Sequence, residues 1–123
     1  MAASLPVVAI VDDDEAIRRS LSRLLKSFSY DPRAFASGGD FIANLGSANP
    51  QCVLLDQHMP GMTGLAVLRR LKEGGSKVPV VVITGHDELG LAQKCLDAGA
   101  SDYLVKPVEA LTLIAAIRQA TIK

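Results

Sequence analysis

Several charged and polar side chains stand directly after hydrophobic runs of this sequence, where folding alone requires no charge. Five hydrophobic runs can be counted along the chain, the second of them weak. Asp12 and Asp13 follow the first run, Asp56 follows the third and Lys106 follows the last. Crowded carboxylates repel one another, so such a group either takes up a proton or binds a cation. Oxygen ligands without cysteine or histidine partners favour a hard ion, and a few carboxylates with room for water favour Mg²⁺, with Mn²⁺ as a substitute.

A carboxylate beside a metal ion, a lysine and a hydroxyl can also act as a nucleophile toward phosphorus. Asp56 would then form an aspartyl phosphate. The metal ion and Lys106 would neutralise the phosphoryl oxygens, and Thr84, which follows the fourth hydrophobic run, would hydrogen-bond one of them. Phosphoryl chemistry is therefore the reactivity that these residue types favour.

Alternating hydrophobic runs and helical patterns must position these side chains. Short unbroken runs are typical of strands buried on both faces of a parallel sheet; they lie at 7–11, 52–55, 80–83 and 103–105, with a weaker candidate at 29–35. The weaker run contains Pro32, which is typical of an edge strand. Helical patterns cover 17–28, 37–45, 63–75, 87–100 and 108–120. Five βα units predict an α/β fold with a doubly wound parallel sheet, whose strands present ligand sites at their carboxyl ends.

Length, charge and cysteine usage narrow the class of protein. A chain of 123 residues without a linker predicts one domain. Thirteen basic residues balance thirteen acidic ones, which argues against a dedicated nucleic-acid binder. Cys52 and Cys95 lie far apart without metal-ligand spacing, so we expect reduced thiols in a cytoplasmic protein. No apolar run approaches the roughly 20 residues of a membrane-spanning helix, so no membrane association is expected.

Four stretches, "VDDDE", "LLDQHMPGMTGL", "VVITGHD" and "GASDYLVKP", resemble in order and spacing the receiver domain of two-component response regulators, in the CheY-like superfamily. The resemblance covers residues 5–120, so we expect residues 1–123 to form a single receiver domain. It implies a flavodoxin-like (βα)5 fold with strand order 2-1-3-4-5. This order places the strand containing Pro32 at an edge and sets Asp12 and Asp13 beside Asp56.

The resemblance also implies a role for each acidic residue. Asp56 would accept the phosphoryl group. Asp13 and Asp56 would ligate Mg²⁺ directly, Asp12 would do so directly or through water, and the backbone carbonyl of His58 would complete the protein ligands.

The remaining matches concern switching. Lys106 would contact the phosphoryl group, and its peptide bond to Pro107 would be cis. Thr84 and Tyr103 would form a switch pair, in which the hydroxyl moves toward the phosphate and the aromatic ring follows inward. Tyr103 as an ordinary core aromatic is the alternative interpretation.

Departures from the family pattern occur at Gln57, His58 and Val108. His58 and His86 stand two residues after Asp56 and Thr84, at variable positions that flank the phosphoryl group in this family. We hypothesise that the two histidines set the rate of autodephosphorylation; plain surface loop residues are the alternative.

The acidic residues at the start of the first helix and the basic residues on its outer side can also be interpreted without phosphoryl chemistry. Asp14 and Glu15 are expected to cap and begin that helix, because its dipole favours negative charge there. The basic residues on its outer side form either a solvated face or a docking surface for a histidine kinase; they are Arg18, Arg19, Arg23 and Lys26.

The favoured function is a phosphorylation-controlled switch that receives its phosphoryl group from a sensor histidine kinase or a phosphotransfer protein. Phosphorylation would shift the face formed by the fourth helix, the fifth strand and the fifth helix. Stretches such as "AFASGGDFI" resemble the subgroup with a C-terminal helix-turn-helix, so we expect transcriptional output, DNA contact only through a domain outside this chain, and phosphorylation-dependent homodimerisation. The chain would catalyse only its own phosphorylation and dephosphorylation and is not expected to be an enzyme otherwise.

Three other functions remain open from the sequence. A Mg²⁺-dependent phosphatase would form the same intermediate, but it usually carries a second aspartate where His58 stands. Nucleotide binding is the second alternative, but no glycine-rich phosphate-binding motif follows any of the predicted strands. A phosphorylation-independent dimerisation module would not need the complete set of acids and lysine.

Overall fold

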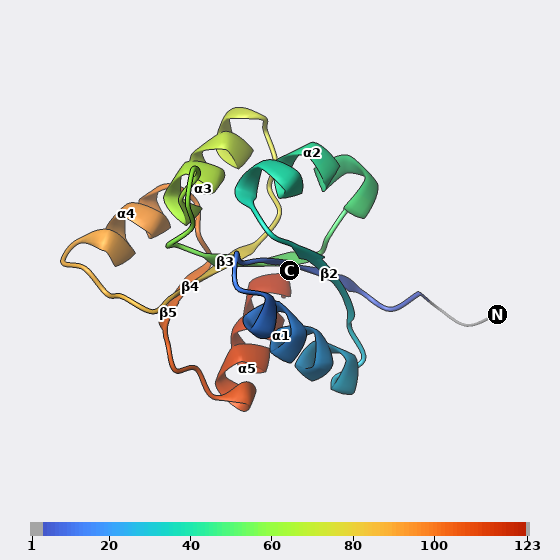
Figure 1. The fold of residues 1–123 in the computed structure, drawn as a ribbon. Coiled ribbons are helices and arrows are strands. Elements are labelled where there is room, and N and C mark those ends of the chain that lie inside the picture. The colour runs from blue at the N-terminus through green and yellow to red at the C-terminus, as the bar shows by residue number, and fades with distance from the viewer. Residues whose placement is uncertain (1–3, 123) are drawn as a thin grey trace.

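A computed structural model describes residues 4–122, in which five parallel strands form one sheet (Figure 1). The strand order is β2-β1-β3-β4-β5, which confirms the predicted flavodoxin-like topology. The strands are β1 (Val7–Val11), β2 (Asp31–Phe35), β3 (Cys52–Asp56), β4 (Val80–Thr84) and β5 (Asp102–Val105). The helices that alternate with them are α1 (Glu15–Ser27), α2 (Gly38–Ala48), α3 (Gly64–Glu73), α4 (Leu91–Asp97) and α5 (Ala110–Thr121).

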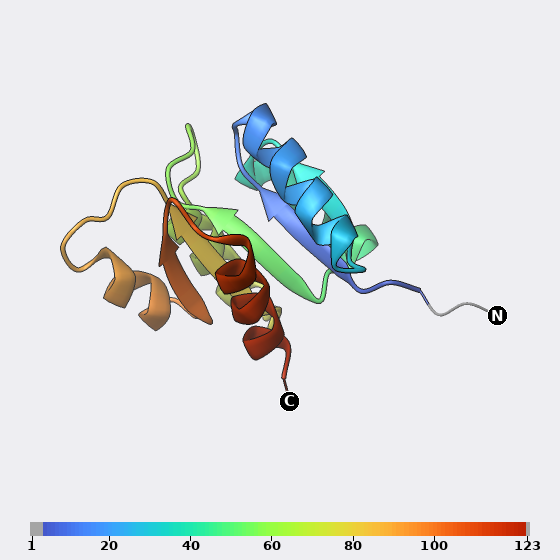
Figure 2. The same ribbon diagram turned by 90° about the horizontal axis from the view of Figure 1, so that it is seen from below.

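Helices cover both faces of the sheet. Figures 1 and 2 show α1 and α5 on one face and α2, α3 and α4 on the other. Side chains of the central strands alternate between the two sides, because successive residues of a strand point to opposite faces. Val8 and Ile10 pack toward α5, whereas Ala9 and Val11 belong to the cluster that contains residues of α2 and α3. Burial on both sides explains why these strands read as unbroken hydrophobic runs.

Polar caps begin three of the helices. The Asp14 carboxylate accepts hydrogen bonds from the backbone N–H groups of Ala16 (2.8 Å) and Ile17 (3.2 Å), which confirms its expected capping role. Ser37 caps α2 and Thr63 caps α3 in the same way, each through its side-chain oxygen. These caps fix the points at which α1, α2 and α3 begin.

The fourth helix is much shorter than the 87–100 predicted. It begins only at Leu91, because Gly90 before it adopts a left-handed conformation (φ 80°) that interrupts the helix. It ends at Asp97, and Gly99 (φ 109°) lets the Ala100 N–H bond back to the Cys95 carbonyl. Residues 85–90 consequently form an exposed loop between β4 and α4.

The second helix is longer than predicted, since it continues to Ala48. Gly38 lies in its first turn, where a Cβ would stand 2.6 Å from a Val67 methyl group, so the glycine permits close packing of α2 on α3. Cys52 and Cys95 are both buried free thiols, as predicted. Among residues 4–122, none of the helices has the length and apolar character that a membrane crossing requires.

Candidate functional site

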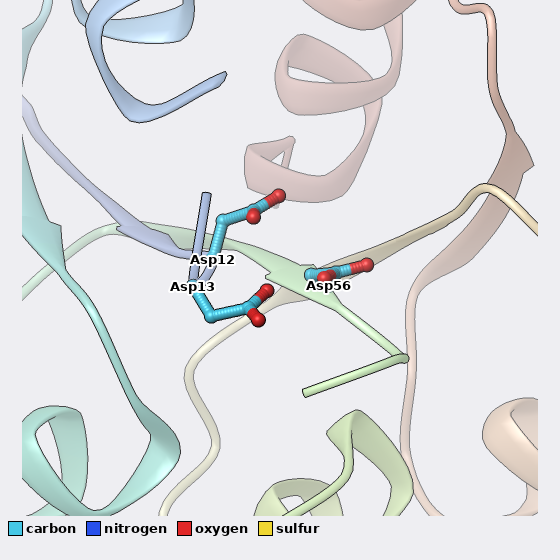
Figure 3. Close-up of side chains that lie close together, drawn as sticks. All are labelled: Asp12, Asp13 and Asp56. Atoms are coloured by element: carbon cyan, nitrogen blue, oxygen red, sulfur yellow. The ribbon is translucent and has the colours of Figure 1, made fainter. Parts of the chain in front are cut away.

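The three aspartates of the predicted metal site converge at the carboxyl ends of two neighbouring strands (Figure 3). Asp12 directly follows β1 and Asp56 is the last residue of β3, and these strands pair in parallel with Val11 opposite Leu55. One carboxylate oxygen of each aspartate lies within 4.8 Å of the others. Asp12 and Asp56 are 4% and 6% exposed, whereas Asp13 is exposed, so the cluster opens to solvent on one side.

Lys106 brings one positive charge to this acidic cluster, which consists of Asp12, Asp13 and Asp56. Its Nζ lies 3.5 Å from Oδ2 of Asp12 and 3.7 Å from Oδ1 of Asp56. Burial raises the pKa of Asp56 above its ordinary value, and the neighbouring Asp12 charge raises it further, while Lys106 lowers it. The ammonium group contacts two of the three carboxylates, and the cluster keeps a surplus of negative charge.

These residues fit a hard divalent cation. All side-chain donors of the cluster are carboxylate oxygens, the ligands that Mg²⁺ and Mn²⁺ accept. Oδ1 of Asp12 accepts a bond from the Asp14 N–H (2.9 Å), and Oδ1 of Asp56 accepts a longer one from the His58 N–H (3.4 Å). Backbone groups therefore orient two of the three carboxylates, while electrostatic repulsion within the cluster favours a bound cation.

Thr84 and Tyr103 lie beside the loop that precedes α4. Thr84 is fully buried, and its hydroxyl donates to the His86 carbonyl (3.0 Å) and accepts from the His86 N–H (3.2 Å). The half-buried Tyr103 ring packs against the hydrophobic cluster on the α4 side of the sheet, and its hydroxyl donates a hydrogen bond to Asp87. Both switch candidates thus engage one loop, and their movement stays a prediction.

The other predicted residues surround the cluster. Pro107 follows Lys106 through a cis peptide bond. The exposed rings of His58 and His86 lie edge to face beside the cluster, with their centroids 5.8 Å apart. A groove of about 410 Å³ between α1 and α5 reaches Asp56 and Lys106, and its walls are mostly aliphatic. The carbonyl of His58 as a metal ligand remains a prediction.

Three residues make contacts around the acidic cluster that the sequence interpretation did not predict. A Cβ on Gly64 would lie 2.8 Å from the Asp56 carbonyl oxygen, so only glycine permits this approach of α3 to β3. The Gln57 side-chain carbonyl accepts from the Leu65 N–H (2.8 Å) and holds the same junction. Arg18 donates to the Asp12 carbonyl (2.8 Å). The only available signals were a glycine after a capping threonine and a polar residue after a buried strand.

Comparison with known proteins gives one consistent result. Residues 8–118 match the response regulator receiver domain family. The chain is 40% identical over 114 residues to the response regulator protein TmoT of Ectopseudomonas mendocina, covering 93% of this chain and 52% of TmoT. It is 37% identical over 118 residues to the transcriptional regulatory protein FixJ of Azorhizobium caulinodans, covering 96% and 56%. The chain thus spans about half the length of these curated relatives.

Solved structures agree with the sequence matches. The crystal structure of FixJ-N superposes with a TM-score of 0.88 at 33% identity, covering 98% of this chain and 95% of that one. A CheY-like receiver domain protein from Methanospirillum hungatei gives a TM-score of 0.90 at 29% identity, with 96% and 94% covered.

Proposed function

Because this chain belongs to the response regulator receiver domain family, whose members are signalling domains rather than classical enzymes, we propose that it is a switch controlled by phosphorylation of Asp56. The observation that supports this proposal most is the placement of Asp56 between Asp12, Asp13 and Lys106 at the open edge of the sheet. Such a site has a nucleophile, a place for a cation and a positive side chain for phosphoryl oxygens.

In the proposed reaction, a carboxylate oxygen of Asp56 attacks the phosphorus of a phosphohistidine on a sensor kinase or phosphotransfer protein. An O–P bond forms, the P–N bond breaks, and the histidine nitrogen keeps the electron pair of the broken bond. Lys106 neutralises part of the charge on the transferring phosphoryl group. Hydrolysis of the resulting acyl phosphate would return the domain to its starting state.

Mg²⁺ is the proposed cofactor, and Mn²⁺ is its substitute. Asp13 and Asp56 would hold it directly, Asp12 directly or through water, and the carbonyl of His58 would complete the protein ligands. When bound, the ion supplies positive charge that offsets the carboxylates and the phosphoryl oxygens. The residues of the chain orient and desolvate Asp56 for the attack.

Switching would follow from the added negative charge. Thr84 would leave the His86 carbonyl for a phosphoryl oxygen, and the Tyr103 ring would follow inward. Apolar side chains are exposed on the elements that would respond: Leu96 of α4 by 44%, Val105 of β5 by 43% and Leu111 of α5 by 72%. This α4-β5-α5 face is the surface that we propose for phosphorylation-dependent homodimerisation.

The proposed output is transcription in a bacterial two-component system. The relatives TmoT and FixJ are named as a response regulator and a transcriptional regulator, and both are about twice as long as the aligned segment. DNA contact would thus come only through an output domain beyond this receiver, in a cytoplasmic protein. The groove between α1 and α5, with the basic side of α1, is the proposed docking surface for the phosphoryl donor.

The two exposed histidines are the proposed determinants of phosphate lifetime, since both flank the acidic cluster. The half-life of the phosphorylated protein should change when both residues are replaced by alanine. An unchanged half-life would exclude this role.

Incubation with a small phosphodonor and Mg²⁺, followed by intact mass spectrometry, tests the proposed function. We expect the wild type to gain one phosphoryl group and Asp56→Asn to gain none. Addition of a chelator should abolish labelling of the wild type. A wild type that binds Mg²⁺ yet remains unlabelled would leave only the dimerisation-module function.

A further inference from the structure

The side chain of His58 connects the loop after β3 to the loop after β4. Its Nε2 lies 3.1 Å from the backbone carbonyl oxygen of His86, 28 residues away in the sequence. A carbonyl oxygen only accepts hydrogen bonds, so Nε2 must carry the proton and donate. The imidazole ring also packs edge to face on the His86 ring, at an interplanar angle of 73°.

The same carbonyl accepts the hydroxyl proton of Thr84. Thr84 Oγ1 lies 3.0 Å from the His86 oxygen, and the His86 N–H returns a bond to Oγ1 at 3.2 Å. A hydroxyl has only one proton to donate. While Thr84 donates to His86, it cannot donate to a phosphoryl oxygen on Asp56.

We propose that His58 is a positioning residue that holds the His86 carbonyl as the acceptor of Thr84, and so keeps the switch hydroxyl away from Asp56 until phosphorylation. This inference rests on the proposed function, because it assumes that Thr84 turns toward a phosphoryl group. It assigns to His58 an effect on the equilibrium between the two states, separate from any effect on phosphate hydrolysis.

The loop that contains His86 has few other contacts, so the hydrogen bond from His58 should affect its position. Residues 85–90 are all exposed, so little packing holds the loop in place. Besides the bonds at His86, a side-chain anchor comes from Tyr103, whose hydroxyl donates to Asp87. When few contacts fix a segment, the loss of one hydrogen bond shifts its population by about threefold to tenfold.

Two substitutions separate the hydrogen bond from the ring. His58→Phe keeps an aromatic ring beside His86 but has no N–H, whereas His58→Gln keeps an N–H donor at a similar reach without the ring. The first readout is the hydrogen-exchange protection of the His86 backbone amide in phosphate-free protein, which reports its bond to Thr84 and does not depend on the ring current of residue 58. The second is the affinity for beryllofluoride in the presence of Mg²⁺, since this phosphoryl mimic binds the state in which Thr84 faces Asp56.

We expect His58→Phe to lower the exchange protection of the His86 amide and to bind beryllofluoride about threefold to tenfold more tightly, because the competent state is more populated. His58→Gln should remain close to the wild type in both measurements. The positioning role would be overturned if both variants matched the wild type, or if His58→Phe and His58→Gln changed the two measurements equally. Failure of the wild type to label with a phosphodonor would overturn the proposed function and this inference with it, whereas normal labelling with indistinguishable variants would overturn the inference alone.

Discussion

The hydroxyl of Tyr103 donates a 3.1 Å hydrogen bond to the carboxylate of Asp87, which joins β5 to the loop before α4. The two residues stand 16 positions apart, and the Tyr103 ring packs against the hydrophobic cluster on the α4 side of the sheet. An inward movement of the ring would have to break this bond. The phenol therefore reports on the state of the loop.

This bond predicts a pH dependence of stability. Burial and the Asp87 carboxylate raise the pKa of Tyr103 from 10 to about 12, because both disfavour the phenolate. A group whose pKa is raised on folding stabilises the fold below its unfolded pKa, and the contribution is lost as the pH rises through the folded pKa. The melting temperature of the wild type should therefore fall more steeply between pH 10 and pH 12 than that of Tyr103→Phe.

Asp87→Asn provides the matched control for this prediction. The amide carries no charge, so the pKa of Tyr103 should move back toward 10 in a spectrophotometric titration of the phenol. An unchanged Tyr103 pKa in Asp87→Asn would show that the carboxylate does not act on the phenol.

Replacement of Asp56 by asparagine should stabilise the metal-free protein. Burial and repulsion raise the pKa of Asp56, so its ionised form at neutral pH opposes folding. This opposition weakens as the pH falls through the folded pKa and is gone below the lower pKa of the unfolded chain. The melting temperature of Asp56→Asn without Mg²⁺ should exceed that of the wild type at pH 7, and the gain on adding Mg²⁺ should shrink. Glu73→Gln, which removes an exposed charge on α3, serves as control and should leave the Mg²⁺ response intact. A less stable Asp56→Asn would contradict the electrostatic interpretation.

Removal of the Lys106 charge should strengthen metal binding while weakening phosphoryl transfer. The ammonium lies within 3.7 Å of two carboxylates and competes electrostatically with a cation. Calorimetric titration of Lys106→Met with Mg²⁺ should give a Kd lower by roughly threefold to tenfold, which corresponds to about 0.7–1.4 kcal/mol. The rate of labelling by a small phosphodonor should fall. Unchanged Mg²⁺ affinity would mean that Lys106 and the ion do not share the site.

Two glycine substitutions should have opposite effects. Gly64→Ala places a Cβ against backbone atoms of Asp56 and Gln57, so the loop must shift, with a loss of about 1–3 kcal/mol in the free energy of unfolding and slower phosphorylation. Gly46→Ala meets no atom within 4 Å and lies in α2, so it should stabilise by about 0.5–1 kcal/mol. Chemical denaturation measures both. Equal stabilities would contradict the close approach at Gly64.

The sheet and the acidic cluster followed from the sequence because both depend on strong, local signals. Unbroken aliphatic runs mark β1, β3 and β4, and the residue after a parallel strand lies at the ligand-binding edge. The strand order 2-1-3-4-5, which the resemblance to receiver domains implied, then placed Asp12 beside Asp56. Helix boundaries were less predictable. Helix α4 begins only after Gly90, because this residue has a positive φ, and hydrophobic periodicity does not reveal the φ of a residue.

The contacts between loops were beyond the reach of sequence patterns. His58 and His86 belong to irregular segments without periodicity, so nothing in the sequence indicated that an imidazole of one loop bonds a carbonyl of the other. The requirement for glycine at position 64 likewise depends on the distance between α3 and β3, which is set by tertiary packing.

The identity of the phosphorylated residue is the most direct test of the central claim. Borohydride reduces an acyl phosphate to an alcohol, so phosphorylated aspartate becomes homoserine. After phosphorylation with a small phosphodonor and Mg²⁺, reduction and peptide mass spectrometry, we predict homoserine at position 56 and unmodified aspartate at positions 12 and 13. Homoserine at either of those two positions, or at none of the three in protein that had gained a phosphoryl group, would contradict the assignment of Asp56 as the phospho-acceptor.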